Sequence, residues 1–371
     1  MRLNKSMMLG AVLLVAACGG GQVEDTEYAE SMPDLAGVSL EINSEGDEGA
    51  KLTAEDFEGV YAQALGGASE YLDGARAEVK SLNSTLRDVI TRIATLANGD
   101  IKTLAKGDVA TYGPKDVDGA SYRLQVKKLG DKRFAWKLEA RAQGSTNDGE
   151  WTLVGAGKLN RGAAAHRGRG QLAINLDKLK KVVPSTPGQG KLMTSFAHTP
   201  GDDKAVSYRL VNFTANAANH EPITGVFVGY RLNPSRFTAV RVLGKWNLSG
   251  SATAAKENVF ARIRFAPGKG GRADILASGG DIANRHVHVG SACWDAQEKE
   301  GFKVVRDCVK GTAGDLGSCT VVSTLGDLTA CHPDLRGEVT PPSDDPNDST
   351  QEPGGPSEAP DTTPDDVTAD F

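Results

Sequence analysis

Two histidines separated by a single residue, His286 and His288, are the best candidates for metal ligands in this sequence. Residues two apart on a β-strand point to the same face, so both imidazoles could bind one ion, with Asp281 or His332 as a third ligand. The alternative is a solvent-facing pair on an amphipathic strand. Because the spacing fixes no third ligand, we expect no metal and no other cofactor.

The signatures of the common enzyme mechanisms do not occur. The G-x-S-x-G turn of serine hydrolases is missing. The segment PGQGKL around Gly190 and Lys191 lacks the first glycine and the final hydroxyl of a phosphate-binding loop. Asp116 and Asp118 offer two carboxylates to calcium, but the later ligands of such a loop are missing. We therefore predict a protein that is not an enzyme and has no catalytic residues.

Four cysteines, Cys293, Cys308, Cys319 and Cys331, lie within 39 residues of one another. The N-terminal segment predicts export, and an even number of cysteines in an exported protein indicates disulfides. A zinc site is the alternative, but the closely spaced C-x2-4-C pairs of such sites are missing. We expect two disulfides, and the sequence leaves all three pairings open.

The fifth cysteine, Cys18, ends an N-terminal segment with its own pattern. Arg2 and Lys5 precede an apolar run over residues 7–17, which is too short to cross a hydrocarbon core of about 30 Å and is typical of a signal peptide. The run closes on Val15-Ala16-Ala17-Cys18, which resembles the lipobox of bacterial lipoproteins. The alternative is an ordinary secretory signal.

The resemblance to lipoproteins implies cleavage before Cys18 and acyl chains, such as palmitate, on its sulfur and its new amino group. More than one chain is needed for stable membrane anchoring. Gly19, not aspartate, follows the cysteine. In this family that favours the outer membrane, and the protein could lie on its periplasmic or its surface face.

Basic and acidic residues are segregated along the chain. The 371 residues include 42 Lys and Arg and 48 Asp and Glu. Residues 19–50 contain nine acids, residues 338–371 contain ten, and neither segment contains Lys or Arg. Apart from Arg2 and Lys5, every basic residue lies in residues 51–337, which therefore hold 40 basic and 29 acidic residues and a net charge of +11.

We expect disordered acidic arms at both ends, the C-terminal one rich in proline, because few apolar groups offset the entropy of ordering them. Val38, Leu40 and Ile42 interrupt the N-terminal arm, so part of it could pair as an edge strand. The arms either provide solubility and reach, or they shield the basic body and compete with an anionic partner for it.

The density of basic residues predicts a patch for an anionic partner. Such a patch concentrates polyanions, and its effect falls with salt. In the cell envelope the partner would be an anionic polymer or lipid, and we expect no cytoplasmic nucleic acid. The alternative is that these side chains only solvate the outer face of a sheet. The candidates are Lys127, Lys128, Lys132, Arg133, Arg167, Arg169, Lys178, Lys180 and Lys181.

A helical region precedes the rest of the body. A short helix is predicted over residues 53–65, and a longer amphipathic helix ends near Asn98 and Gly99. Such a helix either packs on its own domain or forms a coiled coil. Its apolar stripe is Leu72, Ala75, Val79, Leu82, Leu86, Val89, Ile93 and Leu96.

From residue 108 the apolar period changes to two, the period of β-strands. Gly, Asn, Asp and Pro clusters separate the runs at hairpin spacing, and no helix of crossover length lies between them, so an antiparallel sheet is predicted. Alternating runs begin at Tyr122 and Phe134 and continue over residues 151–159, 171–176, 191–196, 206–213, 226–232, 237–243, 259–265, 272–277 and 286–289.

The predicted fold is mainly β, of the α+β class: a large curved antiparallel sheet or half-barrel of about ten strands with an N-terminal amphipathic helix. The predicted segments are a signal peptide (1–17), a lipidated cysteine with an acidic flexible tether (18–50), a helical segment (51–107), the antiparallel body (108–290), its Cys-rich terminal part (291–337) and an acidic tail (338–371).

The predicted function is a non-catalytic binding or structural role of a lipid-anchored envelope protein. The alternatives are a half-barrel carrier or sensor of lipids or lipoproteins, and a hydrolase of envelope polymers. The segments GRADILASGGD and SACWD loosely resemble uncharacterised lipoproteins of myxobacteria, which implies no activity.

Overall fold

The computed structural model describes residues 27–40, 42, 67–99, 101–105, 109–162, 165–198, 204–214, 222–231, 238–248, 255–266, 268–311 and 316–337. The signal peptide, Cys18, the helix predicted over residues 53–65 and the segment 338–371 lie outside the described residues.

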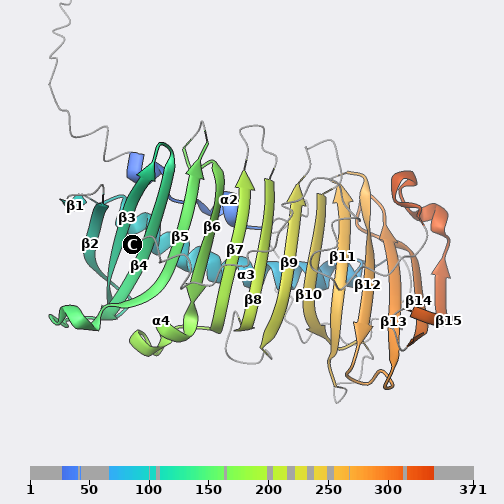
Figure 1. Cartoon of the computed structure of the whole chain (residues 1–371). Coiled ribbons are helices and arrows are strands. Elements are labelled where there is room, and N and C mark those ends of the chain that lie inside the picture. The colour runs from blue at the N-terminus through green and yellow to red at the C-terminus, as the bar shows by residue number, and fades with distance from the viewer. Residues whose placement is uncertain are drawn as a thin grey trace, which may run out of the picture.

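One antiparallel sheet of fifteen strands forms the body, and each strand pairs with its neighbours in sequence from β1 to β15 (Figure 1). The end strands are not hydrogen-bonded to each other, so the sheet stays open. The predicted fold class is therefore confirmed. The strands are β1 (Ile101–Ala105), β2 (Val109–Val117), β3 (Ala120–Gly130), β4 (Arg133–Ala142), β5 (Thr152–Arg161), β6 (Gly168–Asn175), β7 (Gln189–His198), β8 (Lys204–Thr214), β9 (Ile223–Arg231), β10 (Thr238–Trp246), β11 (Glu257–Ala266), β12 (Gly270–Ser278), β13 (His286–Trp294), β14 (Glu300–Lys310) and β15 (Leu316–Gly326).

The expected number of about ten strands is too low. The eleven predicted runs correspond to β3–β13, and the sheet begins at Ile101, not at residue 108. β14 was missed because it is buried on both sides around Val304 and Val305, which removes the alternation. β15 was missed because it is exposed on both sides, with Val321 60% and Val322 59% exposed.

Short turns join most of the strands, as the hairpin spacing predicted. Between β2 and β3, Asp118 and Gly119 both have positive φ angles, 50° and 84°. Two positive φ angles in a two-residue turn give the backbone the twist that antiparallel strands need. The sheet is therefore a meander whose strand order is fixed by local turns.

The helix α3 (Glu70–Ala97) runs across the strands behind the sheet in Figure 1. Its 28 residues span about 42 Å, which equals about nine strand spacings. It contacts β2 and β3 near one end of the sheet and β10 and β11 further along. Every residue of the predicted apolar stripe is buried, so the helix packs on its own domain.

The remaining helical elements are short. Residues 27–30 form a helical turn. The others are α2 (Leu35–Val38), α4 (Leu176–Val182) and the 3-10 helices η2 (Asp148–Glu150), η3 (Leu328–Ala330) and η4 (Pro333–Leu335). α4 was not predicted, because seven residues are too few to show a helical period.

The two sides of the sheet have different side chains. Leu124 and Val126 of β3 belong to the core beneath α3, whereas Arg123 and Lys127 alternate with them and point to the opposite side. We call the side that bears α3 the helix face and the opposite side the open face. The helix face supplies most of the hydrophobic core.

The described N-terminal residues differ from the expected flexible tether. Tyr28, Met32, Val38, Leu40 and Ile42 are all buried in the main core. The apolar residues Val38, Leu40 and Ile42 suggested an edge strand in part of this arm, but residues 35–38 are helical and the apolar side chains pack into the core. The tether prediction over residues 18–50 therefore does not describe residues 27–40 and 42.

Candidate anion-binding surface

The open face carries a large excess of cations. Strand register identifies them, because directly paired residues share one side of a sheet. Among the described side chains of β3–β8 and β10–β12, the open-face carboxylates are Glu139 and Asp274. We call the following open-face cations of β3–β8 and β10–β12 the basic face: Arg123, Lys127, Arg133, Lys137, Arg141, Lys158, Arg169, Lys191, Arg209, Arg241, Lys245, Arg262, Arg264 and Arg272.

Glu139 lies between two cations of the basic face. The Arg123 Nε donates to Glu139 Oε2 at 2.8 Å, and the Lys137 Nζ lies 3.8 Å from Glu139 Oε1. Glu139 is therefore shared by two cations, while the neighbouring Arg141 pairs with Asp148 Oδ1 at 3.4 Å.

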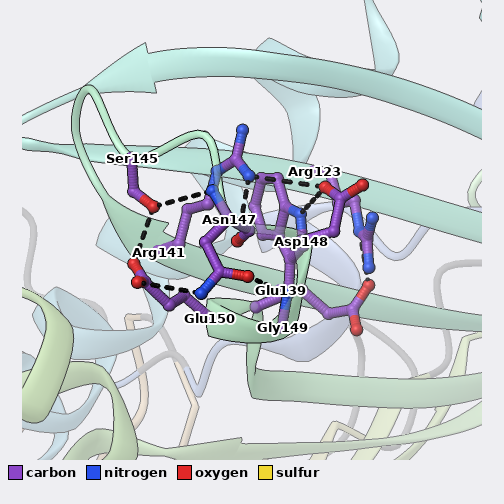
Figure 2. A network of polar contacts seen from close by, with 9 residues as sticks. Arg123, Glu139, Arg141, Ser145, Asn147, Asp148, Gly149 and Glu150 are labelled. Carbon is purple, nitrogen blue, oxygen red and sulfur yellow. Dashed lines mark hydrogen bonds and ion pairs between the residues drawn. The ribbon is translucent and has the colours of Figure 1, made fainter.

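Trp151 orders the adjacent arginines. The guanidinium carbon of Arg123 lies 4.5 Å from the centre of a Trp151 ring, and that of Arg141 lies 4.4 Å away. The indole Nε1 donates to Asp148 Oδ1 at 3.3 Å, in the turn before β5. Figure 2 shows Arg123, Arg141 and Asp148 within this polar network. Cation–π contact holds a guanidinium group without neutralising its charge.

Asp274 is the centre of a buried arginine cluster at the other end of the basic face. Its Oδ2 accepts from the Nη2 atoms of Arg262 and Arg264 at 3.1 and 3.2 Å. Its Oδ1 accepts from Arg272 Nε at 2.8 Å and from Ser291 Oγ at 2.9 Å. The side chains of Asp274 and Arg272 are 0% exposed. Three guanidinium groups thus share the carboxylate of Asp274.

The C-terminal residues cover this arginine cluster. The Arg272 Nη1 donates to the carbonyl oxygens of Leu335 at 2.7 Å and Gly337 at 2.8 Å. The disulfide between Cys293 of β13 and Cys331 attaches the segment to the open face. Two disulfides are thus confirmed, and the pairing that the sequence left open is Cys293–Cys331 and Cys308–Cys319.

The predicted basic patch does not form one surface. Lys127, Arg133 and Arg169 belong to the basic face, and Lys132 lies in the turn before β4. Lys178, Lys180 and Lys181 lie on α4. The remaining two candidates, Lys128 and Arg167, contact Glu27 and His198.

Acids of the N-terminal segment pair with cations outside the basic face. The Lys128 Nζ lies 2.9 Å from Glu27 Oε2, and the Arg161 Nη2 lies 2.6 Å from Glu30 Oε2. The hydrogen bond that Lys128 donates to Glu27 raises the pKa of Lys128. The acids of the N-terminal arm therefore pair with cations on the helix face of the body.

The second half of the basic face was missed by the sequence analysis. Arg241, Lys245, Arg262, Arg264 and Arg272 are spread over three strands, so the density of Lys and Arg along the chain is low there. The alternation could have identified them, because each occupies a position out of phase with the core residues of its strand.

The predicted histidine pair lies on the helix side, beside a carboxylate. The His286 Nδ1 is 2.9 Å from Asp307 Oδ2, and the His288 Nε2 is 3.9 Å from Asp307 Oδ1. Burial lowers the pKa of His288. Within the described part of the chain, no group of three or more His, Cys, Asp and Glu residues is placed to hold a metal. Asp281 and His332 were the expected third ligands. Asp281 Oδ1 instead accepts a hydrogen bond from the Ala255 amide, and His332 Nδ1 accepts one from the Asp334 amide.

Three acids on or beside α3, Glu70, Glu78 and Glu300, are half-buried or buried. Burial raises the pKa of Glu78 to about 7, although Trp246 donates a hydrogen bond to it and Lys256 lies nearby. Burial also raises the pKa values of Glu70 and Glu300, whose carboxylates flank Lys303 at 3.4 and 3.8 Å. These groups lie on the opposite side of the sheet from the basic face. We expect their protonation to affect the stability of the fold.

A groove of about 540 Å³ lies beside α3. Its walls come from residues 29–35, from the C-terminal part of α3 around Ile90 and Ile93, and from His166. Most of the lining is apolar. It lies between the N-terminal segment and the helix, not in a tunnel beneath the helix.

No model of a known protein family matches this chain, and neither a curated protein nor a solved structure is significantly similar to it. Among the described helices, none is long and apolar enough to cross a membrane.

Proposed function

We propose that this chain is a lipid-anchored cell-envelope protein that binds anionic polymers through the basic face and catalyses no reaction. The observation that carries this proposal is the excess of cations on the open face of β3–β8 and β10–β12, whose described open-face carboxylates are Glu139 and Asp274, with Asp116 on the same side of β2. Between β3 and β12 the face extends over nine strand spacings, or about 43 Å. The proposed lipid anchor on Cys18 would hold the protein at the outer membrane.

The arrangement favours a polymer over a small anion. Cations two residues apart on one strand are about 7 Å apart. Across β3–β8 the cations of neighbouring strands are staggered, because each pairs with a neutral residue or with Glu139. Such a staggered array matches repeated phosphate, sulfate or carboxylate groups. Such binding is electrostatic and falls as salt rises.

Heparin, used as a probe polyanion, tests the proposal. The full mature chain should be retained at low salt and released as salt rises. The combined substitutions Arg133→Glu, Arg169→Glu and Arg209→Glu, at three exposed positions of the basic face, should lower the salt needed for release.

The matched control reverses three charges elsewhere. Lys178→Glu, Lys180→Glu and Lys181→Glu change the net charge equally but lie on α4. We expect a smaller shift for this variant. Equal shifts, or no retention of the parent chain at low salt, would refute binding by the basic face.

A second candidate, a carrier or sensor of lipids, is favoured only by the groove beside α3. Pockets of 300–1,000 Å³ are the usual size for small ligands. The exposed Ala94 lines this groove, so Ala94→Trp should abolish binding of a fluorescent fatty acid if the groove holds lipid. The hydrolase alternative has no supporting contact among the described residues.

A further inference from the structure

We propose that the acidic segment 338–371 binds the basic face of its own molecule and competes there with anionic polymers. The competition rests on the proposed function, whereas the intramolecular binding does not. The occupant is therefore a segment of this chain, and the surface is the set of cations defined above.

The position of Gly337 is the first support for this proposal. Its carbonyl oxygen accepts a hydrogen bond from Arg272, which also binds the carbonyl oxygen of Leu335. Arg272 pairs directly with Arg264 in the sheet register. Residue 338, a glutamate, therefore follows a backbone that already contacts the arginine cluster.

The route of the chain up to Gly337 is fixed by several contacts. Cys331 is bonded to Cys293 with a Cα–Cα distance of 5.2 Å. The Arg336 side chain donates to the carbonyl oxygens of Cys331 at 2.8 Å and Thr329 at 2.6 Å. Leu335 is only 2% exposed. The acidic segment thus starts from a defined point on the open face.

Length and charge provide the second support. Residues 338–371 contain ten acids, seven prolines and no Lys or Arg. A proline-rich chain of this length extends to about 100 Å, more than twice the width of the basic face. The segment is therefore long enough to reach the exposed cations across the whole face, and its charge is opposite in sign to theirs.

The N-terminal segment provides a precedent within the same molecule. Glu27 and Glu30 of that acidic arm contact Lys128 and Arg161 at 2.9 and 2.6 Å. Acids from one arm are therefore paired with the basic body in the described structure. The basic face contains more cations than the two that contact Glu27 and Glu30, and the C-terminal arm begins on it.

Intramolecular binding would reduce the apparent affinity for an external polymer. If the segment occupies the face nine-tenths of the time, the competent fraction is one-tenth and the affinity falls about tenfold. Salt weakens both interactions, so the difference should be greatest at low ionic strength.

Zero-length carbodiimide cross-linking of the full mature chain tests the contact directly. At low salt, mass spectrometry should find bonds from carboxylates of residues 338–371 to the amines of Lys191 and Lys245 on the basic face. Lys178 and Lys181 on α4 are the controls and should be linked less. A mixture of isotope-labelled and unlabelled chains distinguishes bonds within one molecule from bonds between molecules.

Heparin binding of a variant with the ten acids of residues 338–371 replaced by Asn and Gln tests the competition. We expect an affinity up to about tenfold higher than that of the parent chain at low salt. Equal affinity, together with no cross-links to the basic face or with cross-links only between molecules, would overturn the inference while leaving the proposed function intact. Cross-links within the molecule, with no heparin binding by either chain, would support intramolecular binding and overturn the proposed function.

Discussion

At the scale of single residues, the described structure places charge in two environments that have different consequences. The carboxylate of Asp274 is buried but surrounded by three guanidinium groups. The carboxyl group of Glu78 is buried beside the Trp246 indole, with Lys256 as its nearby cation. The first environment favours the ionised carboxylate, and the second favours the protonated form.

Glu78 should make the free energy of unfolding depend on pH. Its pKa is about 7 in the folded state, against 4.5 in the unfolded chain. The folded state therefore keeps a proton that the unfolded state releases, and stability falls as pH rises from about 4.5 through about 7. Glu78→Gln should remove this loss, which is at most about 3 kcal/mol, and should be more stable than the parent above pH 7.

Urea unfolding between pH 4.5 and pH 8 measures this difference. Asp88→Asn on the exposed side of α3 is the matched control, and its stability should run parallel to that of the parent chain. A constant difference between Glu78→Gln and the parent across this range would contradict the assignment.

Asp274→Asn should strongly destabilise the fold. The substitution leaves Arg262, Arg264 and Arg272 buried or partly buried beside one another without their shared carboxylate. Removing one partner of a buried ion pair costs about 3 to 5 kcal/mol. The control Asp148→Asn removes the ion pair between Asp148 and Arg141. Because the Asp148 side chain is 90% exposed, this change should cost less than about 1 kcal/mol. Equal midpoints of urea unfolding for the two variants would show that the cluster is not a stabilising centre.

At the scale of elements, the two disulfides constrain different elements near the β15 end of the sheet. Cys308–Cys319 joins paired positions of β14 and β15. Cys293–Cys331 attaches the segment with η3 and η4 to β13. Among the described strands β15 pairs with β14 alone, and it is exposed along most of its length, so few buried side chains hold it in place.

Removing each disulfide should therefore loosen a different element. Cys308→Ala with Cys319→Ala should increase amide hydrogen exchange in β15. Cys293→Ala with Cys331→Ala should do so in residues 327–337. The chain-entropy model gives about 3 kcal/mol for the shorter loop and about 4 kcal/mol for the longer one. Each double variant is the control for the other, and identical exchange maps would contradict the separation.

The elements also show which parts of the fold the sequence could predict. Alternation of apolar and polar residues in the sequence identified strands β3–β13. β14 and β15 lack a clear alternation for opposite reasons, burial on both sides of β14 and exposure on both sides of β15. The basic face was found only in part, because cations gathered by sheet register need not be close in sequence.

The helix α3 was predicted from its apolar stripe, and all of that stripe is buried. The N-terminal segment was misjudged from its acids, because Tyr28, Met32 and Val38 pack into the core regardless of the charge around them. Tertiary burial of scattered apolar residues is not a periodic signal and cannot be read from composition.

At the scale of the whole molecule, the proposed function requires a membrane anchor as well as a binding surface. The described residues begin at residue 27, where the chain already contacts the body through Glu27 and Lys128. The nine residues from Cys18 to that point extend at most about 30 Å. A lipidated Cys18 would therefore hold the body close to the membrane surface, at less than half the distance that a tether reaching to residue 50 would allow.

Cys18 should carry acyl chains in the mature protein. Mass spectrometry of the N-terminal peptide should find a modified cysteine as the first residue. Cys18→Ser should shift the protein from the membrane fraction to the aqueous fraction, and Cys308→Ala with Cys319→Ala should not. An unmodified N-terminus at another position would refute anchoring at this residue.

The strand order from β1 to β15 has a further consequence for how the chain folds. Each strand finds its partners in adjacent sequence, so the sheet has low contact order and can assemble hairpin by hairpin. In such a linear array, neighbouring hairpins are coupled only to each other, as in repeat proteins. The helix α3 differs, since it contacts β2, β3, β10 and β11 at once. We therefore expect docking of this single helix to convert a series of local zippering steps into one cooperative transition.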